Sequence, residues 1–331
     1  MTSINMVDQR LVDFFLSADC CSADDRMMGV EVETLFVDRN GVPINRYILQ
    51  DVFGEMAKSS QWSIAKMAGG LITALVHRNG WSLTVDLGCN NLELTSRPYH
   101  FKAFPWTEQE QILEDIYEFA QKFGVSPLKA SHDGHEDVDT LMVPDDRDRA
   151  WIDLDGQENL IPIGHIASVN YNIDLSSVDE GMHWINILRD GYHQPLVGHH
   201  TSLMHEHDQI WRRYIRESRA NYQEWRYGHM AGNTFELYCW WLSTINVVMQ
   251  RDVNGKLSPC KPAKPLFMTE DVDIDLFLRS VWLYDRLRVR NGRLALEIRN
   301  VPRGSDALIL SEWEVIARKV GLLQAKELVT G

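Results

Sequence analysis

The sequence predicts an α+β fold in which an antiparallel β-sheet is flanked by helices, and three observations support this class. Four Asn-Gly dipeptides lie along the 331 residues, at positions 40–41, 79–80, 254–255 and 291–292. Asn-Gly is a strong signal for a tight β-hairpin, because the turn needs positive φ at its central residues. Segments of alternating polar and apolar residues adjoin three of these dipeptides, and segments with apolar residues at helical spacing lie between them.

Four alternating segments are predicted to be strands of the antiparallel sheet. They are residues 29–37, 81–95, 166–175 and 293–301. Each segment places polar side chains on one face and apolar side chains on the other, because successive side chains of a strand point to opposite faces. A sheet of this kind has one face covered by other elements and one polar face.

The helices are predicted from the spacing of apolar residues. The clearest covers residues 107–123, where Thr107 and Glu110 form a capping box. Helical spacing also predicts helices over residues 208–225, 233–250, 273–286 and 305–328, which makes the second half mostly helical. Residues 131–149 and 257–265 are expected to be loops. The chain has no internal repeat, so a single domain over residues 1–331 is the simplest organisation.

Composition and charge exclude several classes of partner. The 33 basic and 47 acidic residues give a net charge of −14, which disfavours a protein that binds nucleic acid through its phosphates. No apolar stretch is long enough for a membrane span, and the N-terminus does not resemble a signal peptide. The five cysteines form no disulfide framework, so a cytoplasmic protein is expected. The oligomeric state is left open, a homo-oligomer included.

The polar faces of the predicted strands are mainly acidic. If the strands belong to one sheet, its polar face carries Glu31, Glu33, Glu93, Asp174 and Glu297, with Asp86 in a bend before Glu93 and Arg299 as the single cation. For any one strand, a face that simply meets water is an equally good interpretation. A solvated face usually mixes lysine with glutamate, however, and no lysine lies on these four faces.

Crowded carboxylates favour the binding of divalent cations. They repel one another, and either take up protons or are neutralised by a metal ion. Hard oxygen ligands suit Mg²⁺ or Mn²⁺. Such ions beside an arginine are typical of phosphoryl transfer from ATP. The chain contains no P-loop, dinucleotide-binding or hydrolase motif, so ATP would have to bind without a P-loop.

Four short motifs resemble those of a known family. Residues 29–35, Gly-Val-Glu-Val-Glu-Thr-Leu, resemble the Gly-x-Glu-x-Glu-Thr-Leu strand of bacterial glutamate-cysteine ligases, which are carboxylate-amine ligases with a glutamine synthetase type of catalytic sheet. Three further segments match in order: Asp86 with Glu93 seven residues later, Ser-Val-Asn-Tyr-Asn at 168–172, and Leu-Glu-Ile-Arg at 296–299.

The resemblance implies a funnel of antiparallel strands, similar to glutamine synthetase and guanidino kinases, that binds ATP and Mg²⁺ or Mn²⁺. The implied metal ligands are Glu31, Glu33, Asp86, Glu93 and Glu297, with Asn170 where the family has a histidine. Arg299 matches the family's arginine near the transferred phosphate and is the expected catalytic residue. Arg288 and Arg290 are candidates for the ATP phosphates, and Asn170 and Asn172 are assigned to the same nucleotide site.

The resemblance also implies a reaction between small molecules. We expect an ATP-dependent ligase that forms an amide through an acyl phosphate, with glutamate or a related amino acid as carboxylate donor and cysteine or another amine as acceptor. Two alternatives stay open. A phosphotransferase would use a related sheet, and a non-catalytic nucleotide-binding homologue would agree with Asn170 in place of histidine.

Other polar clusters have simpler interpretations. The acidic and histidine-containing loop at 131–140, which includes His132 and Glu136, is more simply a solvated loop than a metal site. The arginines at 212, 213, 216 and 219 more simply pair with surface acids than bind substrate. Arg147 and Arg149 are assigned to a charged turn, and the tryptophans at 240, 241, 282 and 313 to the core.

Overall fold

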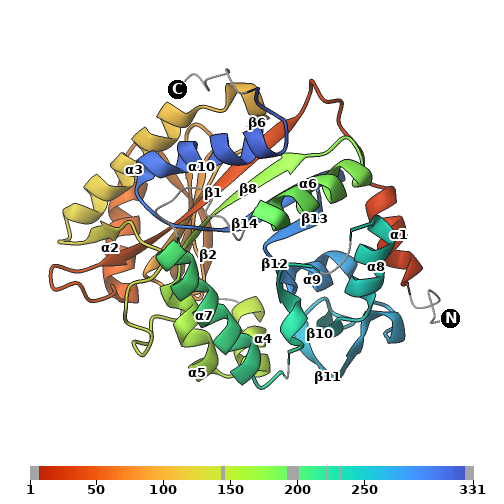
Figure 1. The fold of residues 1–331 in the computed structure, drawn as a ribbon. Coiled ribbons are helices and arrows are strands. Elements are labelled where there is room, and N and C mark those ends of the chain that lie inside the picture. The colour runs from red at the N-terminus through yellow and green to blue at the C-terminus, as the bar shows by residue number, and fades with distance from the viewer. Residues whose placement is uncertain (1–6, 143–145, 192–200, 221, 231–232, 325–331) are drawn as a thin grey trace.

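The computed structural model describes residues 7–142, 146–191, 201–220, 222–230 and 233–324. Within these residues, ten strands form one antiparallel sheet. The strands are β1 Met27–Val37, β2 Trp62–Ala68, β3 Leu71–His77, β4 Ser82–Val85, β5 Asn91–Thr95, β6 Tyr99–His100, β7 Ser126–Leu128, β8 Ser168–Asp174, β13 Asp285–Arg290 and β14 Arg293–Pro302. Their order is β13-β14-β8-β1-β5-β4-β3-β2, and β6 and β7 also pair with β1 (Figure 1). The predicted α+β class is confirmed.

Helices lie on both sides of the sheet. They are α1 Gln9–Leu16, α2 Arg46–Lys58, α3 Trp106–Gln121, α4 Asp146–Asp155, α5 Gln157–Leu160, α6 Val178–Gly191, α7 Thr201–Glu217, α8 Phe235–Ser243, α9 Ile274–Arg279 and α10 Asp306–Lys319. Figure 1 shows α3, α10 and α6 along the upper side of the sheet, whereas α4, α5 and α7 lie together below it. Of the helices described, none is both long and apolar enough to cross a membrane.

The predicted strands are neighbours in the middle of the sheet. The segment 81–95 folds back on itself as β4 and β5, with a bend between them. Glu33 of β1 is in register with Glu93 of β5, and Glu297 of β14 is in register with Asn172 of β8. Because register partners on adjacent strands lie on the same face, the predicted polar side chains share one surface of the sheet.

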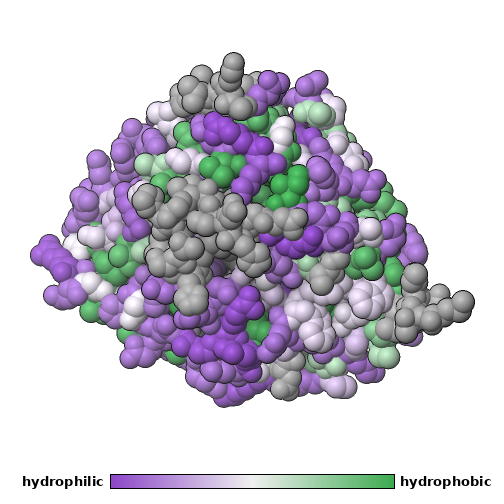
Figure 2. All heavy atoms as spheres, in the orientation of Figure 1, coloured by the Kyte–Doolittle hydropathy of each residue, from purple (hydrophilic) through white to green (hydrophobic). Residues whose placement is uncertain are grey.

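The other face of the sheet is apolar and carries the main hydrophobic core. Val30, Val32 and Tyr171 have no exposed surface there. Apolar residues of α1, α2, α3, α6, α8 and α10 cover them. The Tyr171 hydroxyl donates a hydrogen bond to the carbonyl of Ile309 in α10, over 2.7 Å. The outer surface seen in Figure 2 is mostly hydrophilic, with apolar residues in small separate areas.

A second hydrophobic cluster lies on the polar side of the sheet. It is built from α4, α7, Trp282 and the hairpin of β10 (Asn246–Arg251) and β11 (Leu257–Pro265). The ring centroids of Trp211 and Trp282 are 5.4 Å apart. The Tyr214 hydroxyl donates to the buried carboxylate of Asp155 over 2.6 Å. This cluster and the polar sheet face together enclose the cavity described below.

The helix predicted over residues 233–250 is wrong in its second half. α8 ends at Ser243, and β10 follows it. The predicted loop 257–265 is also wrong, because it forms β11, which pairs with β10 across the Asn-Gly turn at 254–255. The apolar residues of this segment have helical spacing, but pairing of β10 with β11 across the turn stabilises a strand instead. The β-branched valines of β10 also favour a strand.

The helix predicted over residues 273–286 has the same error. α9 ends at Arg279, and β12 (Trp282–Leu283) and β13 follow. β13 pairs with β14 across the Asn-Gly turn at 291–292, where both residues have positive φ, +51° and +81°. The second half of the chain therefore contains several strands, and the expectation that it is mostly helical is wrong.

The remaining predicted helices form with different bounds. α3 begins at Trp106 after Pro105, so Thr107 lies inside the helix and the capping box does not form. α7 ends at Glu217, and α10 ends at Lys319. Helix ends are set by local capping contacts, which a periodic pattern of apolar residues does not specify.

Candidate active site

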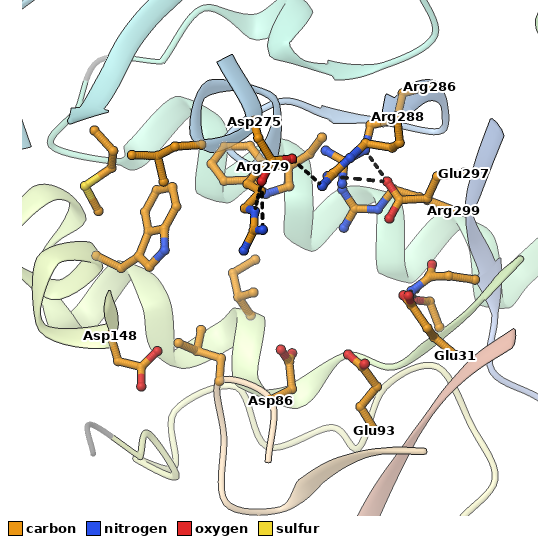
Figure 3. A pocket seen from close by; sticks show the side chains of 18 of the residues that line it. Glu31, Asp86, Glu93, Asp148, Asp275, Arg279, Arg286, Arg288, Glu297 and Arg299 are labelled. Carbon is orange, nitrogen blue, oxygen red and sulfur yellow. Dashed lines mark hydrogen bonds and ion pairs between the residues drawn. The ribbon is translucent and has the colours of Figure 1, made fainter. Parts of the chain in front are cut away.

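A cavity of about 1140 Å³ opens between the polar face of the sheet and the second hydrophobic cluster. Its walls differ in chemistry (Figure 3). One wall is acidic, a second carries arginines, and a third is apolar. All three are built from segments far apart in the sequence, from Glu31 to Arg299.

The acidic wall consists of Glu31, Glu33, Asp86 and Glu93, here called the acidic group. Figure 3 shows Asp86 and Glu93 pointing into the cavity from below. Ser168 donates to the Glu33 carboxylate from its backbone N–H, over 2.7 Å, and from its hydroxyl, over 3.1 Å. These contacts fix the orientation of the Glu33 carboxylate.

Two carboxylates of the acidic group, Glu33 and Glu93, have raised pKa values. Burial and the charges of Asp86 and Glu93 raise the pKa of Glu33 well above its ordinary value. Burial and the charges of Glu31 and Asp86 raise the pKa of Glu93 to about 8. The sheet therefore holds these acids close together without enough positive charge, as the sequence predicted.

The second wall carries more positive charge than the sequence predicted. Arg286, Arg288 and Arg290 of β13 line the cavity together with Arg299 of β14, and these four are here called the arginine group. The expectation of a single cation is wrong because residues 285–290 form a strand, which places every second residue on the polar face. β14 departs from regular pairing between Ile298 and Val301, so Arg299 lies at an irregularity of the strand.

The arginine group surrounds Glu297. Arg286 contacts one carboxylate oxygen closely, Arg288 lies 3.9 Å from the same oxygen, and Arg290 lies 2.8 Å from the other. Burial alone would raise the pKa of Glu297, but the arginine charges outweigh it and lower the pKa well below the ordinary value. Unlike Glu33 and Glu93, Glu297 is neutralised by arginines of the protein itself.

The arginines are anchored to different degrees. Arg286 also donates to the carbonyls of Leu278 and Val281, and burial lowers its pKa to about 9 although Glu297 opposes the shift. Arg288 contacts the carboxylate of Asp275 at 3.2 Å. The buried Nε atoms of Arg288 and Arg290 have no hydrogen-bond partner.

Glu31 lies between the two charged walls. Asn172 donates its amide N–H to Glu31 Oε1 over 3.1 Å, and Asn170 donates to Oε2 over 3.4 Å. Arg290 Nη1 lies 3.0 Å from Glu31 Oε1. The Oδ1 atom of Asn172 is buried beside this contact and has no hydrogen-bond partner.

The third wall is apolar and was not expected from the sequence. Its largest side chains are Trp151 of α4, Trp211 of α7 and Trp282. Asp148 and His207 line the same cavity. Burial and the charges of Arg299 and His132 lower the pKa of His207 to about 4. No local pattern marks these residues, because their segments meet only in the folded chain.

Several predicted residues lie outside the cavity, among them Asn172, which the resemblance assigns to the nucleotide site. Asp174 lies on the polar face, as its register with Ala295 shows, but it does not line the cavity and pairs with Arg293 at 2.7 Å. The loop 131–140 is not simply solvated, because the buried Asp133 carboxylate binds His165 at 2.7 Å. Helix α4 replaces the predicted charged turn at 147–149.

Three of the four arginines at 212, 213, 216 and 219 pair with surface acids, as predicted, whereas Arg216 donates to the carbonyl of Arg212 over 3.2 Å. Arg212 binds Asp208 at 2.6 Å, Arg213 binds Glu136, and Arg219 binds Glu158. Trp241, Trp282 and Trp313 are buried as predicted, whereas Trp240 is 37% exposed and is not a core residue.

The acidic group fits a divalent cation by its chemistry. Its oxygens are hard donors, and burial together with neighbouring carboxylates raises the pKa values of Glu33 and Glu93. In the part of the chain that the structure describes, however, no three acidic, histidine or cysteine side chains are arranged to hold a metal ion. The donors are therefore present, but they do not converge in this conformation.

Comparisons with known proteins give only distant matches. No family model matches the chain, and no curated protein matches it in sequence. The complex of the prokaryotic ubiquitin-like protein Pup and its ligase PafA is similar with a TM-score of 0.38 and 11% identity, over 93% of this chain and 48% of that chain. This chain therefore spans about half the length of that protein.

Two further solved structures are similar at the same level. Glutamate-cysteine ligase from Francisella tularensis, in complex with AMP, has a TM-score of 0.39 and 11% identity, over 94% of this chain and 69% of that chain. A bifunctional glutathione synthetase from Pasteurella multocida has a TM-score of 0.33 and 12% identity, over 97% of this chain and 41% of that chain.

Proposed function

We propose that the protein is an ATP-dependent carboxylate-amine ligase that requires Mg²⁺ or Mn²⁺ and resembles glutamate-cysteine ligases. One observation carries this proposal. The acidic group and the arginine group face the same cavity above an antiparallel sheet. Carboxylates that lack positive charge attract divalent cations, and arginines bind phosphate oxygens, so together they suit a metal-nucleotide complex.

The acidic group would hold the metal. Glu31, Glu33, Asp86 and Glu93 supply carboxylate oxygens, and Asn170 and Glu297 are the further ligands implied by the resemblance. When bound, the metal would neutralise phosphate charge and orient the phosphates for in-line transfer. Ser168 supports this role by holding the Glu33 carboxylate in place.

The arginine group would bind and stabilise the phosphates. Arg288, Arg290 and Arg299 line the same wall of the cavity, and the Nε atoms of Arg288 and Arg290 have no hydrogen-bond partner. Arg286 is tied to Glu297 and to two carbonyls, so its role is to hold Glu297 and the strand in place. Arginine stabilises transferred phosphoryl groups through charge-assisted hydrogen bonds.

The reaction would have two steps. The carboxylate of glutamate or a related amino acid attacks the γ-phosphoryl group, ADP leaves, and an acyl phosphate forms. Cysteine or another amine then attacks the acyl carbon, phosphate leaves, and an amide remains after the amine loses a proton. Arg299 would stabilise negative charge on the phosphoryl group in both steps.

Product analysis tests this function. The protein is incubated with Mg²⁺, ATP and pooled amino acids and amines, and ADP, phosphate and new amides are measured by mass spectrometry and a phosphate assay. A ligase releases ADP and phosphate in equal amounts only when both substrates are present. ADP with a phosphorylated product and no free phosphate would instead indicate a phosphotransferase. Nucleotide binding in calorimetry without any product would indicate a non-catalytic homologue.

A further inference from the structure

Arg290 occupies an unusual position between two carboxylates. Its Nη1 lies 3.0 Å from Glu31 Oε1, and its Nη2 lies 2.8 Å from Glu297 Oε1. Both carboxylate side chains are buried, with 12% and 4% exposure, whereas the Arg290 side chain is 40% exposed. A single guanidinium thus joins the acidic group to the arginine group.

The contact with Arg290 leaves a polar atom beside Glu31 without a hydrogen-bond partner. Asn172 donates to the same Glu31 oxygen that Arg290 contacts, over 3.1 Å. The Oδ1 atom of Asn172, a side chain that is 8% exposed, has no partner. A buried oxygen without a donor beside a carboxylate suits a cation that accepts several oxygen ligands, and Asn172 Oδ1 has no donor while Arg290 contacts Glu31.

Arg290 is also the most exposed of the three arginines of β13. Arg286 and Arg288 have side chains only 6% and 7% exposed, whereas the side chain of Arg290 is 40% exposed. Arg290 lies at the last residue of β13, next to the Asn-Gly turn at 291–292. If Arg290 moved away, Glu297 would keep Arg286 and Arg288, whereas Glu31 would need a new cation.

We propose that Arg290 is a tethered cation that holds the place of the divalent metal beside Glu31 until the metal-nucleotide complex binds. Binding of this complex then moves the guanidinium from Glu31 to the phosphates. The proposal rests on the function proposed above. It has a consequence that does not follow from the proposed function alone. Without nucleotide, the metal must compete with Arg290 for Glu31 and therefore binds weakly. When both are present, metal and nucleotide strengthen each other's binding.

Mn²⁺ binding, measured by electron paramagnetic resonance without nucleotide, tests this proposal. We expect Arg290→Gln to bind Mn²⁺ at least about 10-fold more tightly than the wild type, because the competing charge is gone. Arg290→Lys keeps the charge but cannot bridge two carboxylates with one planar group, so its affinity should lie between them. Saturating ADP should increase the Mn²⁺ affinity of Arg290→Gln less than it increases the Mn²⁺ affinity of the wild type.

Arg293→Gln is the matched control. Arg293 is the register partner of Arg290 in the same hairpin, pairs with Asp174 at 2.7 Å and does not line the cavity. Its Mn²⁺ affinity should equal that of the wild type. If Arg290→Gln and Arg290→Lys fold but bind Mn²⁺ no more tightly than the wild type, the tethered-cation proposal is wrong. If no variant, nor the wild type, binds Mn²⁺ even with ADP, the proposed function fails as well.

Discussion

At the scale of single residues, neighbouring charged side chains shift the pKa values of the carboxylates on the polar face of the sheet. Glu297 is buried, Glu93 is half-buried, and both line the cavity on the polar side of the sheet. Burial and neighbouring acids raise the pKa of Glu93 to about 8, whereas the arginine group lowers the pKa of Glu297 despite its burial. An added cation would therefore stabilise ionised Glu93, whereas Glu297 is already surrounded by the cations of the arginine group.

The raised pKa of Glu93 predicts a pH-dependent stability. Its folded pKa of about 8 lies above the ordinary 4.5, so the folded protein holds a proton that the unfolded chain has released between these values. Its contribution to the free energy of unfolding should therefore fall as pH rises from about 5 to about 8 and stay constant above that. Urea unfolding without metal measures this effect as the difference in free energy of unfolding between Glu93→Gln and the wild type. As pH rises from about 5 to about 8, the variant should become more stable relative to the wild type. A difference that does not change with pH would contradict the assignment.

Arg299 gives a second prediction at this scale. Arg299→Ala should lower turnover by roughly 10²-fold, because a phosphate-binding charge is lost from the cavity wall. Steady-state release of ADP and phosphate measures the loss. Arg219→Ala is the control, since Arg219 pairs with Glu158 on the surface and lies outside the cavity. Wild-type turnover in Arg299→Ala would remove Arg299 from the proposed mechanism.

At the scale of elements, the bend between β4 and β5 positions part of the acidic group. It carries Asp86 and leads into the strand of Glu93. The bend is held by the backbone N–H of Cys89, which donates to the carbonyl of Thr140 over 2.8 Å. Gly88 is needed here because an added Cβ would lie 2.9 Å from the carbonyl oxygen of Gly164, closer than real Cβ contacts allow.

Gly88→Ala should therefore distort the bend and destabilise the protein by about 1–3 kcal/mol. It should also weaken Mg-ATP binding, because Asp86 shifts with the bend. Urea unfolding and calorimetry measure the two effects. The control is Gly54→Ala in helix α2, where an added Cβ meets no atom within 4 Å and alanine favours the helix. Unchanged stability of Gly88→Ala would show that the bend tolerates a side chain.

At the scale of the whole molecule, the cavity joins elements that are otherwise separate. β1 and β5 contribute its acids, β13 and β14 its arginines, and α4 and α7 its apolar wall. A ligand that contacts all three walls binds only the assembled fold. Its binding free energy therefore adds to the stability of the complete chain.

Mg-ADP should accordingly stabilise the wild type by about 2.7 kcal/mol when its concentration is 100 times its dissociation constant. Thermal unfolding with and without Mg-ADP measures this effect. Glu31→Gln and Glu93→Gln should fold but show little or no stabilisation at the same concentration, because each removes a proposed metal ligand. Equal stabilisation of the variants and the wild type would place the nucleotide elsewhere.

Much of the fold and part of the site could be predicted from local patterns. Alternation gave the polar face of β1, β5, β8 and β14, and thereby Glu31, Glu33 and Glu93. The Asn-Gly turn at 291–292 marked the hairpin of β13 and β14, yet the helix predicted over residues 273–286 includes the first two residues of β13. Short segments satisfy helical and strand periods equally well, and only the pairing partner decides between them.

The sequence by itself determined which side chains share a strand face, because the two-residue period of a strand is a local property of the chain. The tertiary structure alone decided which strands are neighbours, which cations face the acids, and what closes the cavity. It gave Glu297 its arginine partners, moved Asp174 out of the site, and added Trp151 and Trp211. These features depend on long-range contacts between segments, and no local spacing of residues encodes such contacts.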